Sequence, residues 1–206
     1  MSSHSDEPAI RPLTAEECEA FIQKFRSWQT VEQSNETYEE LEKIIGEYLL
    51  VGPTEFREAY IARACAEKQP PEQMRLFPYE KGDFEFATNG IMRRFETTEV
   101  MNSGRRRTEE VNTRLASQTS GAPTVKHIDQ DRMNWEDEDG QSRLIRQARA
   151  KAQKDYDFAV TELVLYMNAG WSGHQWDEFL ERAFDEIPEA CNRFRSVWIL
   201  HSDTLH

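Results

Sequence analysis

Apolar side chains recur every three or four residues along the first third of the chain, and this spacing is the feature that most restricts the possible folds. The pattern predicts three helices, each opened by a capping residue, and the second and third are closed by glycine or proline. They are expected near 15–32, from Thr37 to Gly52, and from Thr54 to Pro70. Short helices joined by tight turns are typical of an antiparallel bundle.

The next part of the chain alternates between apolar and polar side chains. The segments 74–78 and 83–87 therefore predict two short strands. Asn89-Gly90 is compatible with the turn of a β-hairpin. The apolar residues that follow also fit a helix over about 90–103, and we favour that helix.

The second half of the chain is expected to hold a long loop over 113–141 and two further helices, from Ser142 to Gly170 and from Ser172 to Pro188. These elements together predict an all-α fold, an antiparallel four-helix bundle with a small β-strand element and a C-terminal extension. The expected division of the chain is a flexible N-terminal arm (1–12), a helical-bundle domain (13–187) and a C-terminal extension (188–206).

Charge is unevenly distributed. The chain has 25 basic and 38 acidic side chains, a formal net charge of −13, which argues against a generally basic nucleic-acid-binding protein. Two places reverse the sign: the run Arg105-Arg106-Arg107, and the stretch 141–154, which contains no acid. These clusters are either a local binding strip for a polyanion or solvated helix faces.

Several classes of protein are not expected. No run of eighteen apolar residues is present, the first residues lack the pattern of a secretory signal, and the three cysteines are widely spaced. The common phosphate-binding, nucleophile-elbow and zinc-protease motifs do not occur. His127, Asp129 and Asp131 match a calcium loop poorly. We therefore expect no catalytic residues, no bound cofactor and no metal site, and interpret the chain as a non-enzymatic protein.

The order of motifs resembles the coat proteins of rod-shaped plant RNA viruses, the tobacco mosaic virus type and its relatives (Virgaviridae). The matching segments are Arg75-Leu-Phe77-Pro78, Asp83-Phe84, Arg105-Arg106-Arg107 followed by Glu110-Val111, and Trp176 to Phe184. The long loop and the C-terminal extension resemble the furovirus or pecluvirus branch of that family.

The resemblance implies a structural coat protein that assembles with itself into a helical capsid around single-stranded genomic RNA, in virions and the host cytoplasm, without a membrane. It assigns RNA phosphates to Arg105 and Arg107, with Arg146, Arg143 and Arg149 as further partners. Arginine suits this role because its planar guanidinium pairs with two phosphate oxygens at once.

The resemblance also assigns Glu110 to a carboxylate pair between subunits, where protons or weakly held calcium would control disassembly. An acidic helical interaction protein of the inhibitor or immunity type is the alternative interpretation, and a helical enzyme of unknown chemistry is a third.

Overall fold

The computed structural model describes residues 10–46, 52–77, 82–100, 137–167, 176–201 and 204–205. Its helices are α1 (Ala15–Arg26), α2 (Val31–Ile45), α3 (Thr54–Lys68), α6 (Asp137–Ala152), α7 (Trp176–Asp185) and α8 (Pro188–Arg193). Its strands are β1 (Gln73–Leu76), β2 (Phe84–Thr88), β3 (Ile91–Val100), β4 (Thr161–Met167), β5 (Val197–His201) and β6 (Thr204–Leu205).

Within the described residues, the strands form one mixed six-stranded sheet in chain order, from β1 to β6. The β1–β2, β2–β3 and β5–β6 pairs are antiparallel, whereas β3–β4 and β4–β5 are parallel. Helix α6 lies in the connection between β3 and β4, and α7 and α8 lie between β4 and β5, as crossovers between parallel strands require. The prediction of an all-α four-helix bundle is therefore wrong, and the fold is of the α/β class.

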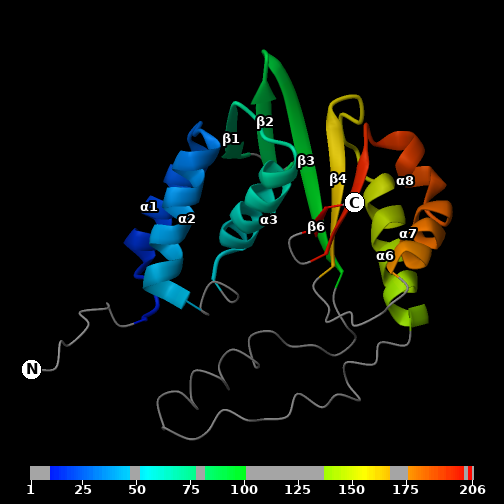
Figure 1. Cartoon of the computed structure of the whole chain (residues 1–206), viewed down its shortest axis with the longest axis horizontal. Coiled ribbons are helices and arrows are strands. Elements are labelled where there is room, and N and C mark those ends of the chain that lie inside the picture. Colours follow the sequence, from blue (N-terminus) through cyan, green and yellow to red (C-terminus); the bar gives the residue numbers. More distant parts are fainter. Residues whose placement is uncertain are drawn as a thin grey trace, which may run out of the picture.

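The sheet is the middle of three layers (Figure 1). Helices α1, α2 and α3 pack on one face, where Phe84, Phe86 and Phe95 of the sheet meet Phe25 and Phe56. Helices α6, α7 and α8 cover β3, β4 and β5 on the other face, where the buried side chains include Leu144, Ala148, Leu163, Leu165, Phe179 and Ile199.

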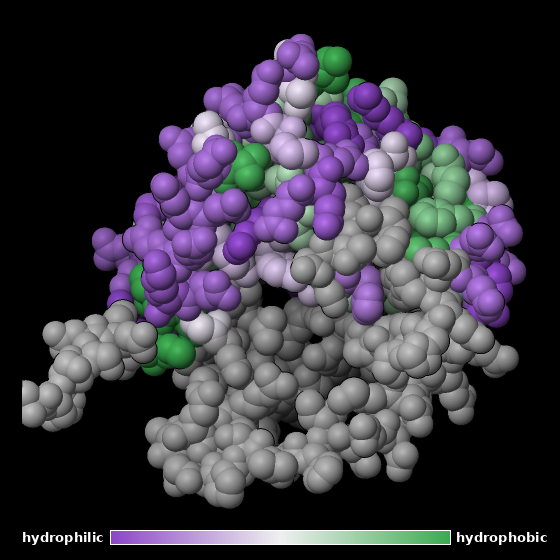
Figure 2. Space-filling view, in the orientation of Figure 1, coloured by the Kyte–Doolittle hydropathy of each residue, from purple (hydrophilic) through white to green (hydrophobic). Residues whose placement is uncertain are grey.

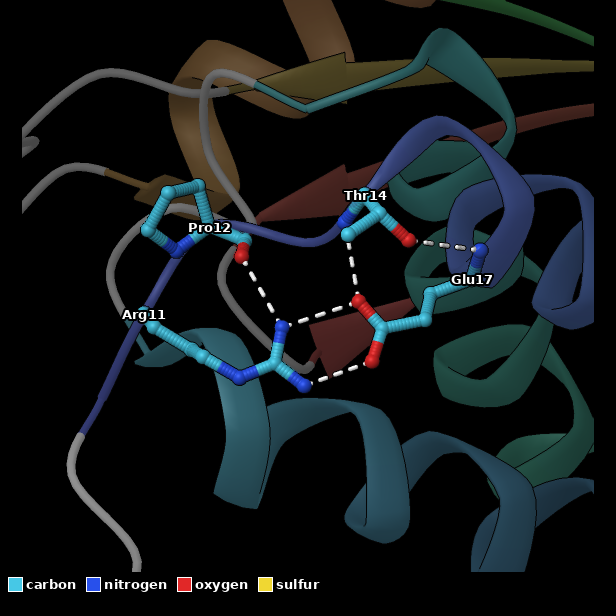
Figure 3. Close-up of polar contacts among 4 residues, drawn as sticks. All are labelled: Arg11, Pro12, Thr14 and Glu17. Atoms are coloured by element: carbon cyan, nitrogen blue, oxygen red, sulfur yellow. Dashed lines mark hydrogen bonds and ion pairs between the residues drawn. The ribbon is translucent and has the colours of Figure 1, made fainter.

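Helix α1 begins at the capping box that the sequence predicts. The hydroxyl of Thr14 accepts a hydrogen bond from the Glu17 amide, and the Glu17 carboxylate accepts one from the Thr14 amide (Figure 3). Arg11 donates through both terminal nitrogens to the same carboxylate, and this hydrogen bond lowers the pKa of Glu17 to about 2. The start of α1 is thus fixed to the chain that precedes it.

Helix α2 begins earlier than predicted. The Thr30 hydroxyl accepts from the Gln33 amide, and the Gln33 side chain accepts from the Thr30 amide, so Thr30 and not Thr37 is the capping residue. The Thr37 hydroxyl instead donates to the Gln33 carbonyl within the helix. The predicted helix near 15–32 is therefore two helices, with the break at Ser27–Thr30.

This difference predicts the effect of two matched substitutions. Thr30→Ala removes a capping acceptor and is expected to lower the free energy of unfolding by about 1 kcal/mol. Thr37→Ala removes only a hydroxyl that donates back to its own helix, so its effect is expected to be within about 0.5 kcal/mol. Urea denaturation of both variants measures this, and a larger loss for Thr37→Ala would contradict the assigned helix start.

The predicted helix from Ser142 to Gly170 is also only half right. Its first part is α6, but the chain leaves the helix after Ala152, and Thr161–Met167 form β4. Leu163 and Leu165 face α6 to α8, and Val164 faces α1 to α3. A strand buried on both faces is a continuous apolar run, and such a run in a short window fits a helix equally well.

The favoured helix over 90–103 is wrong as well, and the hairpin alternative is confirmed over the described residues. Asn89 and Gly90 both have positive φ, 52° and 74°, as the turn of a two-residue hairpin requires. Strands β2 and β3 pair antiparallel on either side of it. The two short strands predicted before the turn are confirmed as β1 and β2.

The residues expected as a C-terminal extension contribute α8, β5 and β6, and Ala190, Phe194 and Ile199 are buried in the core. Hydrophilic side chains cover most of the described surface over α1 and α2 on the face that Figure 2 shows. Among the described helices, none has the length and apolar character needed to cross a membrane.

Candidate functional site

Charged side chains occur inside the sheet, between aromatic residues that form the core. In β2, Glu85 lies between the buried Phe84 and Phe86, and in β3, Glu96 follows the buried Phe95. Neighbouring residues of a strand point to opposite faces, so the phenylalanines face α1 to α3 and the glutamates face the side of α6. The glutamates are therefore placed on the α6 side of the sheet by the same alternation that builds the core.

Asp83 stands where β2 begins, immediately after Gly82. Gly82 has a φ of 127°, and a Cβ at this position would lie 2.7 Å from Cδ of Arg94, so only glycine fits here. The Asp83 carboxylate accepts hydrogen bonds from the amide and the hydroxyl of Thr97, both at 2.6 Å. These bonds hold the carboxylate against β3.

Asp83 lies just before the first pair of the β2–β3 register, in which Phe84 faces Phe95, and its amide donates to the Phe95 carbonyl at 2.7 Å. Glu96 is almost fully buried, with 8% of its side chain exposed, and it forms an ion pair with Lys151 of α6. The Tyr156 hydroxyl donates to the same carboxylate oxygen at 2.8 Å, and burial together with this bond raises the pKa of Tyr156.

A third carboxylate approaches from α3. An ion pair of 3.1 Å between Arg57 and Glu99 ties this helix to β3, and Glu58 is the next residue. Burial and the nearby Asp83 carboxylate raise the pKa of Glu58 to about 8. Burial, followed by the charge of Glu96, raises the pKa of Asp83. The three acids therefore repel one another in a partly desolvated space.

The site thus combines Asp83, just before β2, with Glu96 of β3 and Lys151 of α6, and Glu58 of α3 is close enough for the charges of Asp83 and Glu96 to act on it. Within the described parts of the chain, no three His, Cys, Asp or Glu side chains lie close enough to hold a metal ion by themselves. Mg²⁺, however, is commonly bound by only one or two carboxylates, with water and substrate oxygens completing its shell. Asp83 and Glu96, whose charges act on each other, are the carboxylates that such an open arrangement would use.

The residues that the sequence singled out lie elsewhere. Arg105, Arg107 and Glu110 are outside the described residues. Helix α6 contains Arg143, Arg146 and Arg149, which are three residues apart. Three residues rotate by about 300° around the helix axis, so each arginine is displaced by about 60° from the one before it. The three arginines therefore spiral around α6 and do not form one row.

Each of these arginines has different surroundings. Arg149 donates to the Glu186 carbonyl at 2.9 Å and lies 3.7 Å from the Glu189 carboxylate, so it joins α6 to α8. Arg146 is exposed and, with Arg149, lines an open pocket of about 510 Å³ on the outer side of α6. Arg143 is half-buried near the start of α6, and eight residues, or about 80° around the helix axis, separate it from Lys151.

The sequence marked Asp83 only within a family motif and Lys151 only within the basic stretch 141–154, and it assigned no functional role to these two residues, to Glu96 or to Glu58. Fifty-five residues separate Lys151 from Glu96, so only the three-dimensional fold brings them together. One signal was available in the sequence. From Asp83 to Phe86, acids alternate with phenylalanines in a predicted strand. The phenylalanines predict that one face of this strand is in the core, so the acids on its other face lie next to the core.

The fold and the site define a three-layer α/β protein with a buried carboxylate–lysine cluster at the junction of its antiparallel and parallel strands. Comparison of the chain with models of protein families, with curated proteins and with solved structures gave no match in any of the three.

Proposed function

We propose that this protein is an enzyme that hydrolyses phosphodiester bonds with the help of a divalent cation held at Asp83 and Glu96. The observation that carries the proposal is that Glu96, which pairs with Lys151 of α6, lies close enough to Asp83 and Glu58 for the charges of the three acids to act on one another. Buried acids that repel one another lower stability, and a cluster of them with raised pKa values is a candidate for chemistry. The described residues contain none of the common catalytic sequence motifs that would compete with this assignment.

The reaction is the addition of water to phosphorus, in which one P–O ester bond breaks and the leaving oxygen takes up a proton. A divalent cation at Asp83 and Glu96 would polarise a phosphate oxygen and lower the pKa of a bound water molecule. Lys151 adds a positive charge next to Glu96, where a phosphate gains negative charge during the reaction. Glu58, with its pKa near 8, is able to take up or release a proton close to neutral pH.

The surrounding contacts keep the proposed ligands in place. Thr97 fixes the Asp83 carboxylate through two donors, and Tyr156 fixes one oxygen of Glu96. Such outer hydrogen bonds orient ligands and reduce the rearrangement that binding requires.

The test is incubation of the full chain with labelled single-stranded and duplex DNA and RNA, with Mg²⁺ or Mn²⁺ and with a chelator. We expect metal-dependent cleavage of at least one of these polymers and no cleavage when the chelator is present. Absence of cleavage for every polymer with both metals would overturn the proposal. Equal cleavage with the chelator would overturn the role of the cation.

The coat-protein function and the inhibitor alternative stay untested predictions. The resemblance implied a four-helix bundle, and that fold is wrong. Its principal residues, Arg105, Arg107 and Glu110, lie outside the described residues. The expectation that the chain is not an enzyme is likewise untested, and the carboxylate–lysine cluster is the reason to test the opposite.

A further inference from the structure

A pair of arginines lies on the α6 side of the sheet, next to the proposed catalytic cluster. Arg75 of β1 and Arg94 of β3 both donate to Glu85 of β2, which lies between them. The Glu85 side chain is 4% exposed, whereas those of Arg75 and Arg94 are 25% and 28% exposed. The carboxylate is therefore buried beneath two guanidinium groups that reach the surface.

Aromatic rings hold the two guanidinium groups from their flat sides. Arg75 lies 4.4 Å from the ring centre of Trp28, and Arg94 lies 4.2 Å from that of Phe77. This arrangement fixes both side chains while leaving part of their hydrogen-bonding capacity unused by Glu85. Each guanidinium has five N–H donors, and its bonds to Glu85 come from Nε and Nη2.

The position of this group relative to the cluster is fixed by the strands. Arg94 is two residues before Glu96 on β3, so the two are about 6.6–6.8 Å apart along the strand, and Glu85 is two residues after Asp83, which stands just before β2. The group carries two positive charges and one negative charge, and therefore a net positive charge. The net positive charge therefore lies about two strand residues from the acidic cluster. At that distance it can bind the phosphate next to the phosphate that is cleaved in a polynucleotide strand.

We propose that Arg75 and Arg94, held by Glu85, Trp28 and Phe77, form a phosphate-binding subsite for the nucleic-acid strand that the neighbouring cluster cleaves. The inference rests on the proposed function, because it specifies the substrate as a polynucleotide and not as a small phosphodiester. The arginines position the strand and do not take part in bond cleavage. Trp28 and Phe77 add apolar surface against which a base or sugar can pack.

The experiment measures binding of fluorescent single-stranded DNA by anisotropy as a function of salt, with chelator present and in an Asp83→Asn background. Each phosphate contact contributes about 0.7 to the slope of log affinity against log salt for a single strand. Arg75→Gln and Arg94→Gln are each expected to reduce that slope by about 0.7 and to weaken binding roughly 3- to 10-fold at low salt. Arg63→Gln, on α3 in the opposite layer, is the matched control and is expected to leave the slope unchanged.

A further variant separates phosphate binding from a purely structural role. Glu85→Gln removes a negative charge beneath the arginines and is expected to maintain or strengthen binding. If Glu85→Gln instead weakens binding as much as the arginine variants do, the group is only structural and the inference is wrong. Unchanged slopes in both arginine variants, or no DNA binding at low salt in the parent protein, would also overturn it.

The outcomes for the two proposals remain distinguishable. A protein that cleaves DNA, but whose salt dependence is unaffected by Arg75→Gln and Arg94→Gln, contradicts the subsite and leaves the proposed catalytic function intact. A protein that binds DNA with the expected slopes, but cleaves no polymer, contradicts the catalytic function and leaves phosphate binding by the arginines intact.

Discussion

The Glu96→Gln variant is expected to cleave phosphodiester bonds at least about 10³-fold more slowly than the wild-type protein, because it removes a charged ligand from the proposed cation site. The glutamine keeps the size of the side chain and an acceptor for the Tyr156 hydroxyl. Loss of activity in a folded variant therefore reports the loss of charge and not a loss of packing. The initial rate of cleavage, measured beside the thermal unfolding curve, tests this expectation.

Two comparisons make that result specific. Glu189→Gln removes a carboxylate of α8 that lies 3.7 Å from Arg149 and outside the cluster. The cleavage rate of this variant is therefore expected to equal that of the wild type. Lys151→Arg keeps the positive charge beside Glu96, whereas Lys151→Gln removes it. We expect more activity in Lys151→Arg than in Lys151→Gln, and equal rates in the two would argue against an electrostatic role for Lys151.

The second large effect is on stability and depends on pH. The pKa of Glu58 is about 8 in the folded protein and about 4.3 in an unfolded chain. Between these values the folded state keeps a proton that the unfolded state has lost, so the contribution of Glu58 to stability falls as the pH rises through this window. Above pH 8 the folded protein contains a charged Glu58 in repulsive surroundings.

Glu58→Gln mimics the protonated side chain and removes this dependence. We expect the variant to match the wild type near pH 4 and to be more stable above pH 8 by about 1–3 kcal/mol. For a chain of this size, each kcal/mol corresponds to roughly 2–4 °C in Tm. The charged groups that act on Glu58 are Asp83, Glu55, Arg57 and Glu96, and all are kept in the variant.

Thermal unfolding of both proteins across this pH range measures the effect. Glu67→Gln is the matched control, because Glu67 lies on the same helix and forms an i,i+4 ion pair with Arg63 at 3.5 Å. Its difference from the wild type is expected to show no trend between pH 5 and pH 9, since the pair is on the surface. A Glu58→Gln effect of the same size at every pH would contradict the raised pKa that burial and the neighbouring carboxylates give Glu58.

Local signals in the sequence predicted much of the first layer. The Thr14 capping box, the helix from Thr54 and the strands around 74 and 84 are all found, because each depends on residues close together in the chain. The Asn89-Gly90 dipeptide correctly indicated the turn of a hairpin. The apolar residues after the turn also match a helical spacing, and this coincidence led to the wrong helix over 90–103.

The sheet and the site depended on contacts that are distant in the sequence. Thr161–Met167 is an apolar run in isolation, and it becomes a central strand only when β3 and β5 pair with it on either side. The ion pair between Glu96 and Lys151 follows from that pairing and from the packing of α6 on the sheet. The basic residues of α6 were noticed as a cluster, yet Lys151 serves a buried acid while Arg149 joins α8.

The most direct test of the central claim is the initial rate of polynucleotide cleavage by the wild-type protein and Asp83→Asn, measured side by side as Mg²⁺ is increased from zero to saturation. The wild-type rate is predicted to rise with Mg²⁺ and to level off, whereas the Asp83→Asn rate stays at the background of the metal-containing buffer. Equal rates for the two proteins at every Mg²⁺ concentration would contradict the assignment of the site.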